Sequence, residues 1–171
     1  VNQFFFFFGK EVFFKVQLVG LSEEVMLENC SFSVHTYKLL KEVKKVDLVL
    51  IPALSGDMEQ ALALNKKMVP WIVNQYNNGA EVASLCIGAF LLASTGLLNG
   101  KKCSTHWNSA NEFRQMFPAV ELVDGSIITE ENGIYSSGGA NSYWNLLLYL
   151  VEKYTDRETA ILASKYFAVD I

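Results

Sequence analysis

The residue best placed to do chemistry in this sequence is Cys86. It lies between the apolar run Ala80–Leu85 and the run Ile87–Ala93, a pattern that predicts a buried strand turning sharply into a helix. At such a corner, free N–H groups and the helix dipole favour a negatively charged sulfur. Cys86 is therefore a candidate nucleophile. A buried cysteine is also commonly a small core residue, and Ser84–Gly88 keeps only the last glycine of the G-x-S-x-G elbow.

A cysteine nucleophile needs a general base within hydrogen-bond reach, and the chain has two histidines, His35 and His106. His35 lies in a predicted extended stretch and is interpreted as a surface or half-buried polar residue. His106 follows a predicted strand and could approach Cys86. Next to Trp107 it could equally be a packed structural residue. His106 is thus the candidate base if the protein is an enzyme.

Two glycine-containing loops are candidate ligand-binding segments, because glycine lets backbone N–H groups approach a ligand closely. One follows the predicted strand 46–52, and the other follows the predicted strand 134–136. The same glycines would suit simple tight turns, and the asparagine that ends the second loop would suit a helix N-cap. The candidate ligand-binding residues are Ser55, Gly56, Cys86, Ile87, His106, Ser137, Gly138, Gly139 and Asn141.

The elements that must position these residues alternate between strands and helices. Predicted strands cover 13–20, 46–52, 80–85, 102–106 and 120–123, a hairpin covers 127–136, and predicted helices cover 37–43, 57–77, 87–96, 108–117, 141–154 and 156–168. The alternation predicts an α/β fold, a flavodoxin-like three-layer sandwich with a mostly parallel sheet and helices on both faces. Ligands of such sheets bind beyond the carboxyl ends of the strands, so we expect Cys86, His106 and the loop Ser137–Asn141 to border one concavity.

Composition narrows the class of protein. The 171 residues are enough for one domain, expected to span 1–171, and 51% hydrophobic against 19% charged residues excludes a disordered chain. A net charge of -4 with scattered lysines argues against direct DNA binding. No apolar run reaches the roughly 18 residues of a membrane span. Three cysteines without paired ligand spacing favour a reduced, cytoplasmic setting without structural metal. We expect no cofactor.

The N-terminus contains the run Phe4–Phe8, which fits neither a helical nor a strand period. It lacks the basic region and cleavage site of a signal peptide. We have no physical account of this run. Because the sequence starts at Val1 without methionine, we expect it to be a fragment.

The middle of the chain resembles the ThiJ/PfpI superfamily, which has the class I glutamine amidotransferase-like fold. The stretch that carries the resemblance runs from Ser84 through Ala93 and on from Gly96 to Trp107. The ending Thr105-His106-Trp107, the loop 136–142 and the closing residues 166–171 are similar to one branch, the sensory domain of AraC-type transcriptional regulators. The resemblance implies that a helix-turn-helix domain follows this chain, and that a first strand with an acidic partner for Cys86 precedes it.

The sequence departs from the enzymes of that superfamily at Ile87. Protease-like members place a histidine directly after the elbow cysteine and isonitrile hydratases a threonine, whereas an aliphatic side chain cannot act as a base. We therefore expect a ligand-sensing, dimerising domain that binds a small nitrogen-containing metabolite and reaches DNA only through another domain. The alternative is a cysteine-dependent hydrolase or hydratase using Cys86. The apolar stretch Trp144–Val151 would suit self-association, or packing against the final helix.

Overall fold

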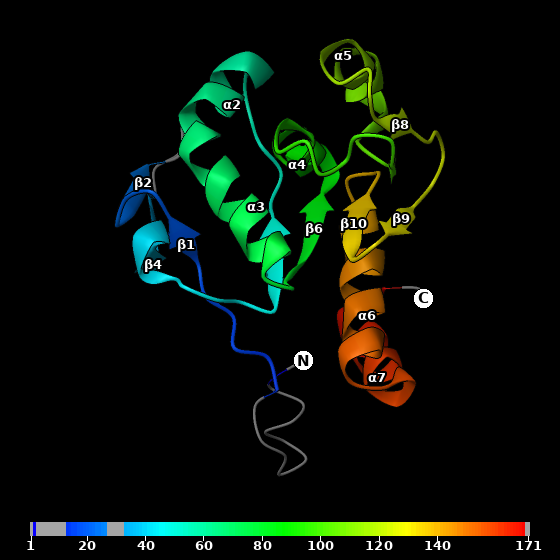
Figure 1. Ribbon diagram of the computed structural model, residues 1–171. Helices are drawn as coiled ribbons and strands as arrows, with labels where there is room; N and C mark the ends of the chain where they lie inside the picture. The colour runs from blue at the N-terminus through cyan, green and yellow to red at the C-terminus, as the bar shows by residue number, and fades with distance from the viewer. Residues whose placement is uncertain (1, 3–12, 27–32, 170–171) are drawn as a thin grey trace. The chain divides into compact units, whose positions relative to one another are not determined.

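The computed structural model describes residues 2, 13–26 and 33–169, shown in colour in Figure 1. The run Phe4–Phe8 and the cysteine Cys30 lie outside the described residues. The chain divides into two compact units, Val1–Lys45 and Val46–Ile171. Each unit is described by itself.

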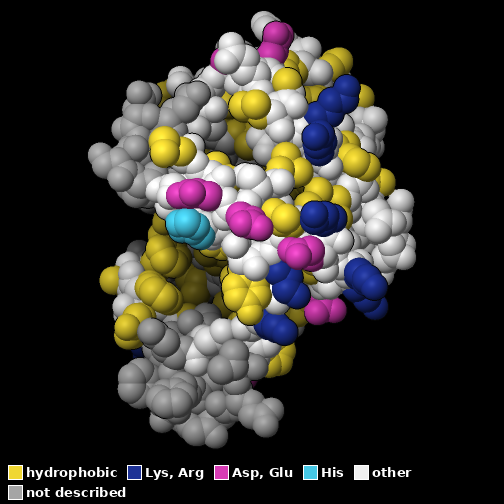
Figure 2. Space-filling view, turned by 90° about the vertical axis from the view of Figure 1, so that its left-hand side faces the viewer, with side chains coloured by type: hydrophobic (Ala, Val, Ile, Leu, Met, Phe, Trp, Pro, Cys, Tyr) yellow, Lys and Arg dark blue, Asp and Glu magenta, His cyan; other side chains and the backbone are white. Residues whose placement is uncertain are grey.

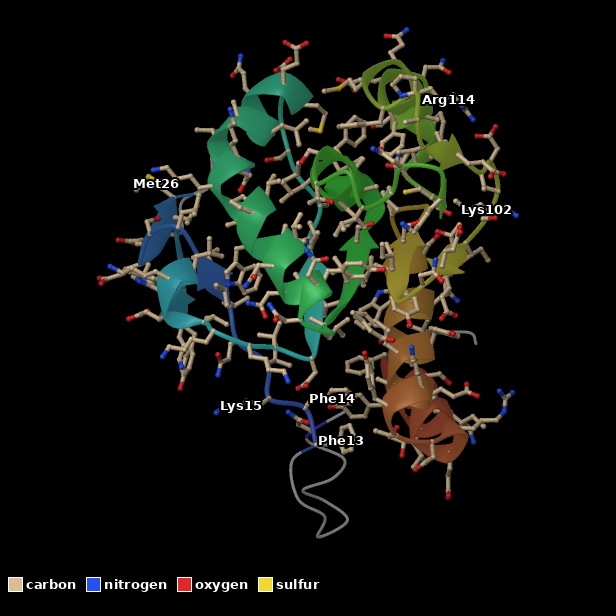
Figure 3. The ribbon with its side chains drawn as sticks, viewed as in Figure 1. Phe13, Phe14, Lys15, Met26, Lys102 and Arg114 are labelled. Atoms are coloured by element: carbon tan, nitrogen blue, oxygen red, sulfur yellow. The ribbon has the colours of Figure 1, made fainter. Side chains whose placement is uncertain are left out.

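The first unit is built from two short strand pairs. Strand β1 (Val19–Gly20) pairs in parallel with β4 (Lys38–Leu39), and β2 (Glu24–Met26) pairs antiparallel with β3 (Ser33–His35). Ahead of β1, the rings of Phe13 and Phe14 meet edge to face with centroids 5.0 Å apart (Figure 3). The strand predicted over 13–20 is therefore regular only at its end.

The helix predicted over 37–43 is wrong. The backbone N–H groups of Tyr37 and Lys38 both donate to the carbonyl of Leu18, at 2.7 and 3.2 Å, so this segment is committed to strand pairing. Only a single 3₁₀ turn, Leu40–Glu42, follows. Its start is held by the Glu42 carboxylate, which accepts the Leu39 N–H at 2.7 Å.

The second unit contains a four-stranded sheet in the order β5 (Leu48–Ile51), β6 (Glu81–Leu85), β10 (Ile134–Ser137) and β9 (Ile128–Glu131). The first three strands are parallel, and β9 joins β10 as an antiparallel hairpin. Asn132 and Gly133 turn the hairpin with positive φ angles of 55° and 75°, as an Asn-Gly pair favours. A further parallel pair joins β7 (Lys102–Cys103) to β8 (Glu121–Leu122).

The helices of this unit lie between strands or, in the case of the last two, after β10. They are α2 (Met58–Asn65), α3 (Val69–Asn77), α4 (Ala89–Ser94), α5 (Ala110–Met116), α6 (Ser142–Tyr154) and α7 (Arg157–Phe167). The helix predicted over 57–77 is split into α2 and α3 by the 3₁₀ turn Lys66–Met68. Pro70 explains the break, because it has no N–H for the carbonyl one turn earlier and its ring crowds that carbonyl.

Two separate cores lie on opposite faces of the sheet, because successive strand residues point to opposite sides. On β6, Val82 joins a core that includes Ile72 of α3 and Phe90 of α4, whereas Ala83 joins a core with Leu146 and Leu150 of α6. In Figure 1, α3 and α6 accordingly lie on opposite sides of β6 and β10. This arrangement confirms the predicted three-layer α/β sandwich.

Helix α6 is enclosed on two sides, because its Leu146 and Leu150 face the sheet while α7 packs along it. Packing against the final helix therefore accounts for much of the apolar content of Trp144–Val151. At its C-terminal end, α6 is tied to the sheet by polar contacts. Lys153 Nζ lies 2.5 Å from Glu81 Oε1, and the hydroxyls of Tyr154 and Tyr135 also donate to Glu81.

Candidate functional site

Cys86 occupies a strained corner between β6 and α4. It begins the 3₁₀ turn Cys86–Gly88, and its φ of +55° lies in the left-handed region that costs a non-glycine residue about 1–2 kcal/mol. The predicted strand-to-helix corner with unusual backbone geometry is therefore present. Gly88 is required here for space: a Cβ would lie 2.5 Å from the carbonyl oxygen of Pro52 and 2.7 Å from that of Ile51.

Two hydroxyl side chains hold the peptide groups of Cys86. Its backbone N–H donates to Ser137 Oγ at 3.3 Å, and its carbonyl oxygen accepts from Thr105 Oγ1 at 3.3 Å. Ser137 ends β10, and Thr105 lies two residues after β7. The carboxyl ends of β6 and β10 and the segment after β7 therefore meet at the elbow.

Behind the elbow lies a cluster of buried hydroxyl groups that the sequence analysis missed. Ser136 Oγ accepts the backbone N–H of Ser104 at 2.6 Å and shares a hydrogen bond with Thr129 Oγ1 at 2.5 Å. These contacts connect β10, β9 and the end of β7. The available signal was the concentration of serine and threonine at the ends of apolar strands. The buried serine and threonine residues on these strands and in the segment after β7 are Ser84, Ser104, Thr105, Thr129, Ser136 and Ser137.

The loop after β10 crosses this cluster at close range. A Cβ on Gly138 would lie 2.8 Å from the carbonyl oxygen of Ser126, so glycine is needed for the close approach. The Gly138 N–H donates to the Ile127 carbonyl at 3.1 Å, and the Gly139 N–H donates to Ser142 Oγ at 2.9 Å. Gly138 thus has a structural partner just before β9, and Gly139 has one at the start of α6.

Burial raises the pKa of the Cys86 thiol, and the backbone N–H of Ile87 opposes this shift without cancelling it. The expected preference for a negatively charged sulfur at the helix N-terminus is therefore not realised. The reason is that desolvation of the half-buried thiol penalises the thiolate more than the turn stabilises it. Burial of Cys86 thus favours the neutral thiol over the thiolate.

His106 makes its contacts within its own turn. Its Nδ1 accepts the backbone N–H of Asn108 at 3.3 Å, and its ring centroid lies 5.6 Å from that of Trp107. These contacts fit the structural interpretation of this histidine and give its ring no orientation toward Cys86. His35 is a surface residue as expected, with Nε2 3.6 Å from Glu24 Oε1 and 75% of its side chain exposed.

The remaining predicted residues lie at the carboxyl ends of strands but make fewer contacts. Gly56 follows β5 with a φ of +78°, and a Cβ there would meet nothing within 4 Å. Asn141 occupies the N-cap position of α6, yet its side chain makes no capping hydrogen bond. The side chain of Ser142 instead accepts a hydrogen bond from the backbone N–H of Gly139 in the preceding loop. None of these contacts joins Gly56 or Asn141 to Cys86.

Among the described residues, 2, 13–26 and 33–169, no group of three or more His, Cys, Asp or Glu side chains is arranged to hold a metal ion. In the same part of the chain, no helix has both the length and the apolar character needed to cross a membrane.

Comparison with known proteins shows the family. Residues 10–153 match the DJ-1/PfpI family. The HTH-type transcriptional regulator CdhR of Pseudomonas aeruginosa is 26% identical over 144 residues, covering 84% of this chain and 42% of CdhR. The regulator GbdR of the same species is 27% identical over 122 residues, covering 71% of this chain and 32% of GbdR. The chain therefore spans less than half the length of these relatives.

The fold is shared with solved structures. An AraC family transcriptional regulator from Pseudomonas putida aligns with a TM-score of 0.72 at 18% identity, covering 88% of this chain and 80% of that one. A ThiJ/PfpI family protein from Pseudomonas syringae aligns with a TM-score of 0.77 at 18% identity, covering 92% of this chain and 64% of that one. With the elbow at Cys86 and the three-layer sandwich in place, the chain belongs to the DJ-1/PfpI family.

Proposed function

We propose that this chain is the ligand-sensing, dimerising domain of an AraC-type transcriptional regulator and binds a small nitrogen-containing metabolite beside Cys86. The observation that carries the proposal is that the candidate base at the family elbow, His106, is engaged within its own turn, beside a half-buried thiol whose pKa is raised by burial. A nucleophile in that state lacks the activation that covalent catalysis needs.

The names of the relatives support the same function. CdhR and GbdR are HTH-type transcriptional regulators, and both extend well beyond the segment that matches this chain. DNA would be contacted by another domain of the full-length protein, which would act in the cytoplasm. On the face shown in Figure 2, Lys and Arg side chains are interspersed with Asp and Glu, whereas phosphate binding requires clustered positive charge.

The ligand would lie against the carboxyl ends of the strands. The candidate contacts are the Cys86 thiol, Ile87, the Ser55–Gly56 loop, His106 and the loop Ser137–Asn141. Their polar groups are mostly neutral backbone and hydroxyl groups. Such groups suit a small ligand that is held by directed hydrogen bonds.

A second candidate function is a cysteine-dependent hydrolase or hydratase. The specific observation in its favour is the positive φ of Cys86, since strain of this kind at a non-glycine residue is typical of functional sites. In this alternative Cys86 would attack a carbon–nitrogen bond, and His106 or an acidic residue outside this sequence would handle the proton.

One experiment separates the two functions. The protein and its Cys86→Ala variant are incubated with simple amides and isonitriles, and product is followed by mass spectrometry. A sensor gives the same background for both proteins. Cys86-dependent turnover at about one per second or faster would establish the enzyme and overturn the proposal. Sedimentation equilibrium tests the dimer, and a single monomeric species at micromolar concentration would contradict that part.

A further inference from the structure

Four aromatic side chains form a surface cluster where the start of α6 meets the end of α7. We call Tyr143, Trp144, Tyr166 and Phe167 the aromatic patch. The rings of Trp144 and Phe167 have centroids 5.2 Å apart, those of Tyr143 and Trp144 5.0 Å, and those of Tyr166 and Phe167 5.1 Å. Tyr166 is 62% exposed and Phe167 42% exposed. Contiguous exposed aromatic surface of this kind marks interaction sites in soluble proteins.

The patch is confined to one end of the helix pair. At the other end of α6, Lys153 and Tyr154 are held against the sheet by Glu81. Along α7, the residues buried against the rest of the unit are small: Thr159, Ala160, Ala163 and Ser164. The large aromatic side chains of α7 therefore lie on its last turn, outside the close packing that holds the helix in place.

Helix α7 lies after the part of the chain that matches the family. The DJ-1/PfpI match ends at residue 153, and α7 begins at Arg157. The helix stops at Ala168, whose φ is +53°, and the Val169 N–H donates to the Ser164 carbonyl at 2.9 Å. The backbone therefore leaves α7 directly beside Tyr166 and Phe167.

The patch is connected to the elbow through few residues. The Cys86 N–H donates to Ser137, the loop after Ser137 is capped by Ser142, and Trp144 lies two residues further along α6. A change in this loop would reach Trp144 on α6 before it reached α7. The aromatic patch is therefore well placed to sense what occupies the site.

We infer that the aromatic patch is the surface on which the DNA-binding domain of the full-length regulator docks. The inference rests on the proposed function and adds to it the contact through which the two domains would communicate. This occupant is favoured because the related regulators carry more than half of their length outside the matching segment, and because Tyr166 and Phe167 lie after residue 153, where the family match ends. A second copy of the chain is the competing occupant.

The test uses the full-length regulator and limited proteolysis of the connection that follows α7. Tyr166→Ala and Phe167→Ala remove docking contacts, so the connection opens more often and is cut about tenfold faster, which corresponds to roughly 1.4 kcal/mol of lost docking energy. Tyr37→Ala is the matched control, since Tyr37 is 70% exposed in the other unit. Its cleavage rate should equal that of the parent. Tyr166→Phe, which keeps the ring, should also behave like the parent.

Two results would overturn the inference. Equal cleavage of the parent, Tyr166→Ala and Phe167→Ala would show that nothing docks on the patch. Conversion of a dimer to a monomer by Tyr166→Ala, seen by sedimentation, would assign the patch to a second copy. Either result is compatible with a regulator that binds DNA and responds to ligand. A full-length protein without sequence-specific DNA binding would instead contradict the proposed function itself.

Discussion

Lys153 of α6 forms an ion pair with Glu81, the first residue of the strand whose carboxyl end leads into Cys86, with 2.5 Å between Nζ and Oε1. The ammonium also lies 4.9 Å from the centroid of the Tyr135 ring and donates to the Tyr135 hydroxyl. At the far end of the same strand, Ser137 and Thr105 hold the Cys86 peptide groups. Polar contacts between distant segments therefore fix both ends of β6.

The first prediction concerns the acid stability of this ion pair. Burial raises the pKa of Glu81, but hydrogen bonds from Lys153, Tyr154 and Tyr135 outweigh it and hold the pKa below the ordinary value. The stabilisation is therefore present above the unfolded-state pKa and is lost as pH falls through the folded-state value. Glu81→Gln should lower the free energy of unfolding by about 1 kcal/mol at pH 7, discounted for partial exposure.

Urea unfolding at pH 7 and pH 3 checks this prediction. The difference between Glu81→Gln and the parent should shrink at pH 3. The control is Asp124→Asn, which breaks the exposed pair with Arg114, the outward-pointing side chain labelled on α5 in Figure 3. That pair is worth little because water screens it. A Glu81→Gln effect no larger than that of Asp124→Asn would contradict the role of the ion pair.

The alkaline side gives a second prediction, for Tyr135. Burial, reinforced by the nearby carboxylates, raises the pKa of Tyr135 to about 12, against the effect of its hydrogen bond with Lys153. Because the unfolded chain ionises this tyrosine near pH 10, stability should fall as pH rises from about 10 to 12. Tyr135→Phe should flatten this loss, measured as the urea midpoint against pH. An unchanged slope would show that Tyr135 titrates normally.

The third prediction concerns the reactivity of Cys86. Because burial raises the thiol pKa, little thiolate is present at pH 7 and alkylation by iodoacetamide should be slower than for a free cysteine. The rate should rise with pH through a midpoint above the ordinary value of about 8.5. Site-resolved mass spectrometry measures the rate at Cys86, with the buried Cys103 as the internal comparison. A midpoint below 8 would indicate an activated nucleophile and favour the enzyme.

The fourth prediction tests the hydroxyl that holds the elbow. Ser137→Ala removes the acceptor of the Cys86 N–H, and an unsatisfied buried N–H costs about 1–3 kcal/mol. The unfolding free energy should drop by that amount, and alkylation of Cys86 should change as its turn loosens. Ser109→Ala is the control, because Ser109 makes no capping hydrogen bond at the start of α5. Equal unfolding midpoints for both variants would show that Ser137 does not support the elbow.

The fifth prediction separates steric from conformational demands on glycine. Gly88→Ala should destabilise strongly, by about 3 kcal/mol or with loss of folding, since the new methyl group would overlap two backbone carbonyl oxygens. Gly56→Ala meets no neighbour, but its φ of +78° costs about 1–2 kcal/mol. Thermal unfolding of the two variants ranks these effects. A Gly88→Ala protein as stable as Gly56→Ala would show that the elbow can shift to make room.

Local patterns in the sequence determined the elements that build the fold. The apolar runs around Cys86 predict its strand-to-helix corner, and Asn132-Gly133 predicts the hairpin turn. Both predictions are possible because strand burial, helix period and turn geometry depend on neighbouring residues. The same local rules failed for 37–43. In that segment the backbone N–H groups of Tyr37 and Lys38 donate to the carbonyl of Leu18, which belongs to a separate segment of the chain, and not to carbonyls within a helix.

The state of the site was decided by the tertiary structure alone. Cys86 and Ser137 are 51 residues apart, and Glu81 and Lys153 are 72 apart, so neither contact leaves a local signal in the sequence. The thiol pKa likewise depends on how much water the folded chain removes from Cys86. The sequence by itself determined where a nucleophile would sit. Packing decided that this residue is held in place and half-buried with a raised thiol pKa, because desolvation and long-range hydrogen bonds exist only once the strands have assembled.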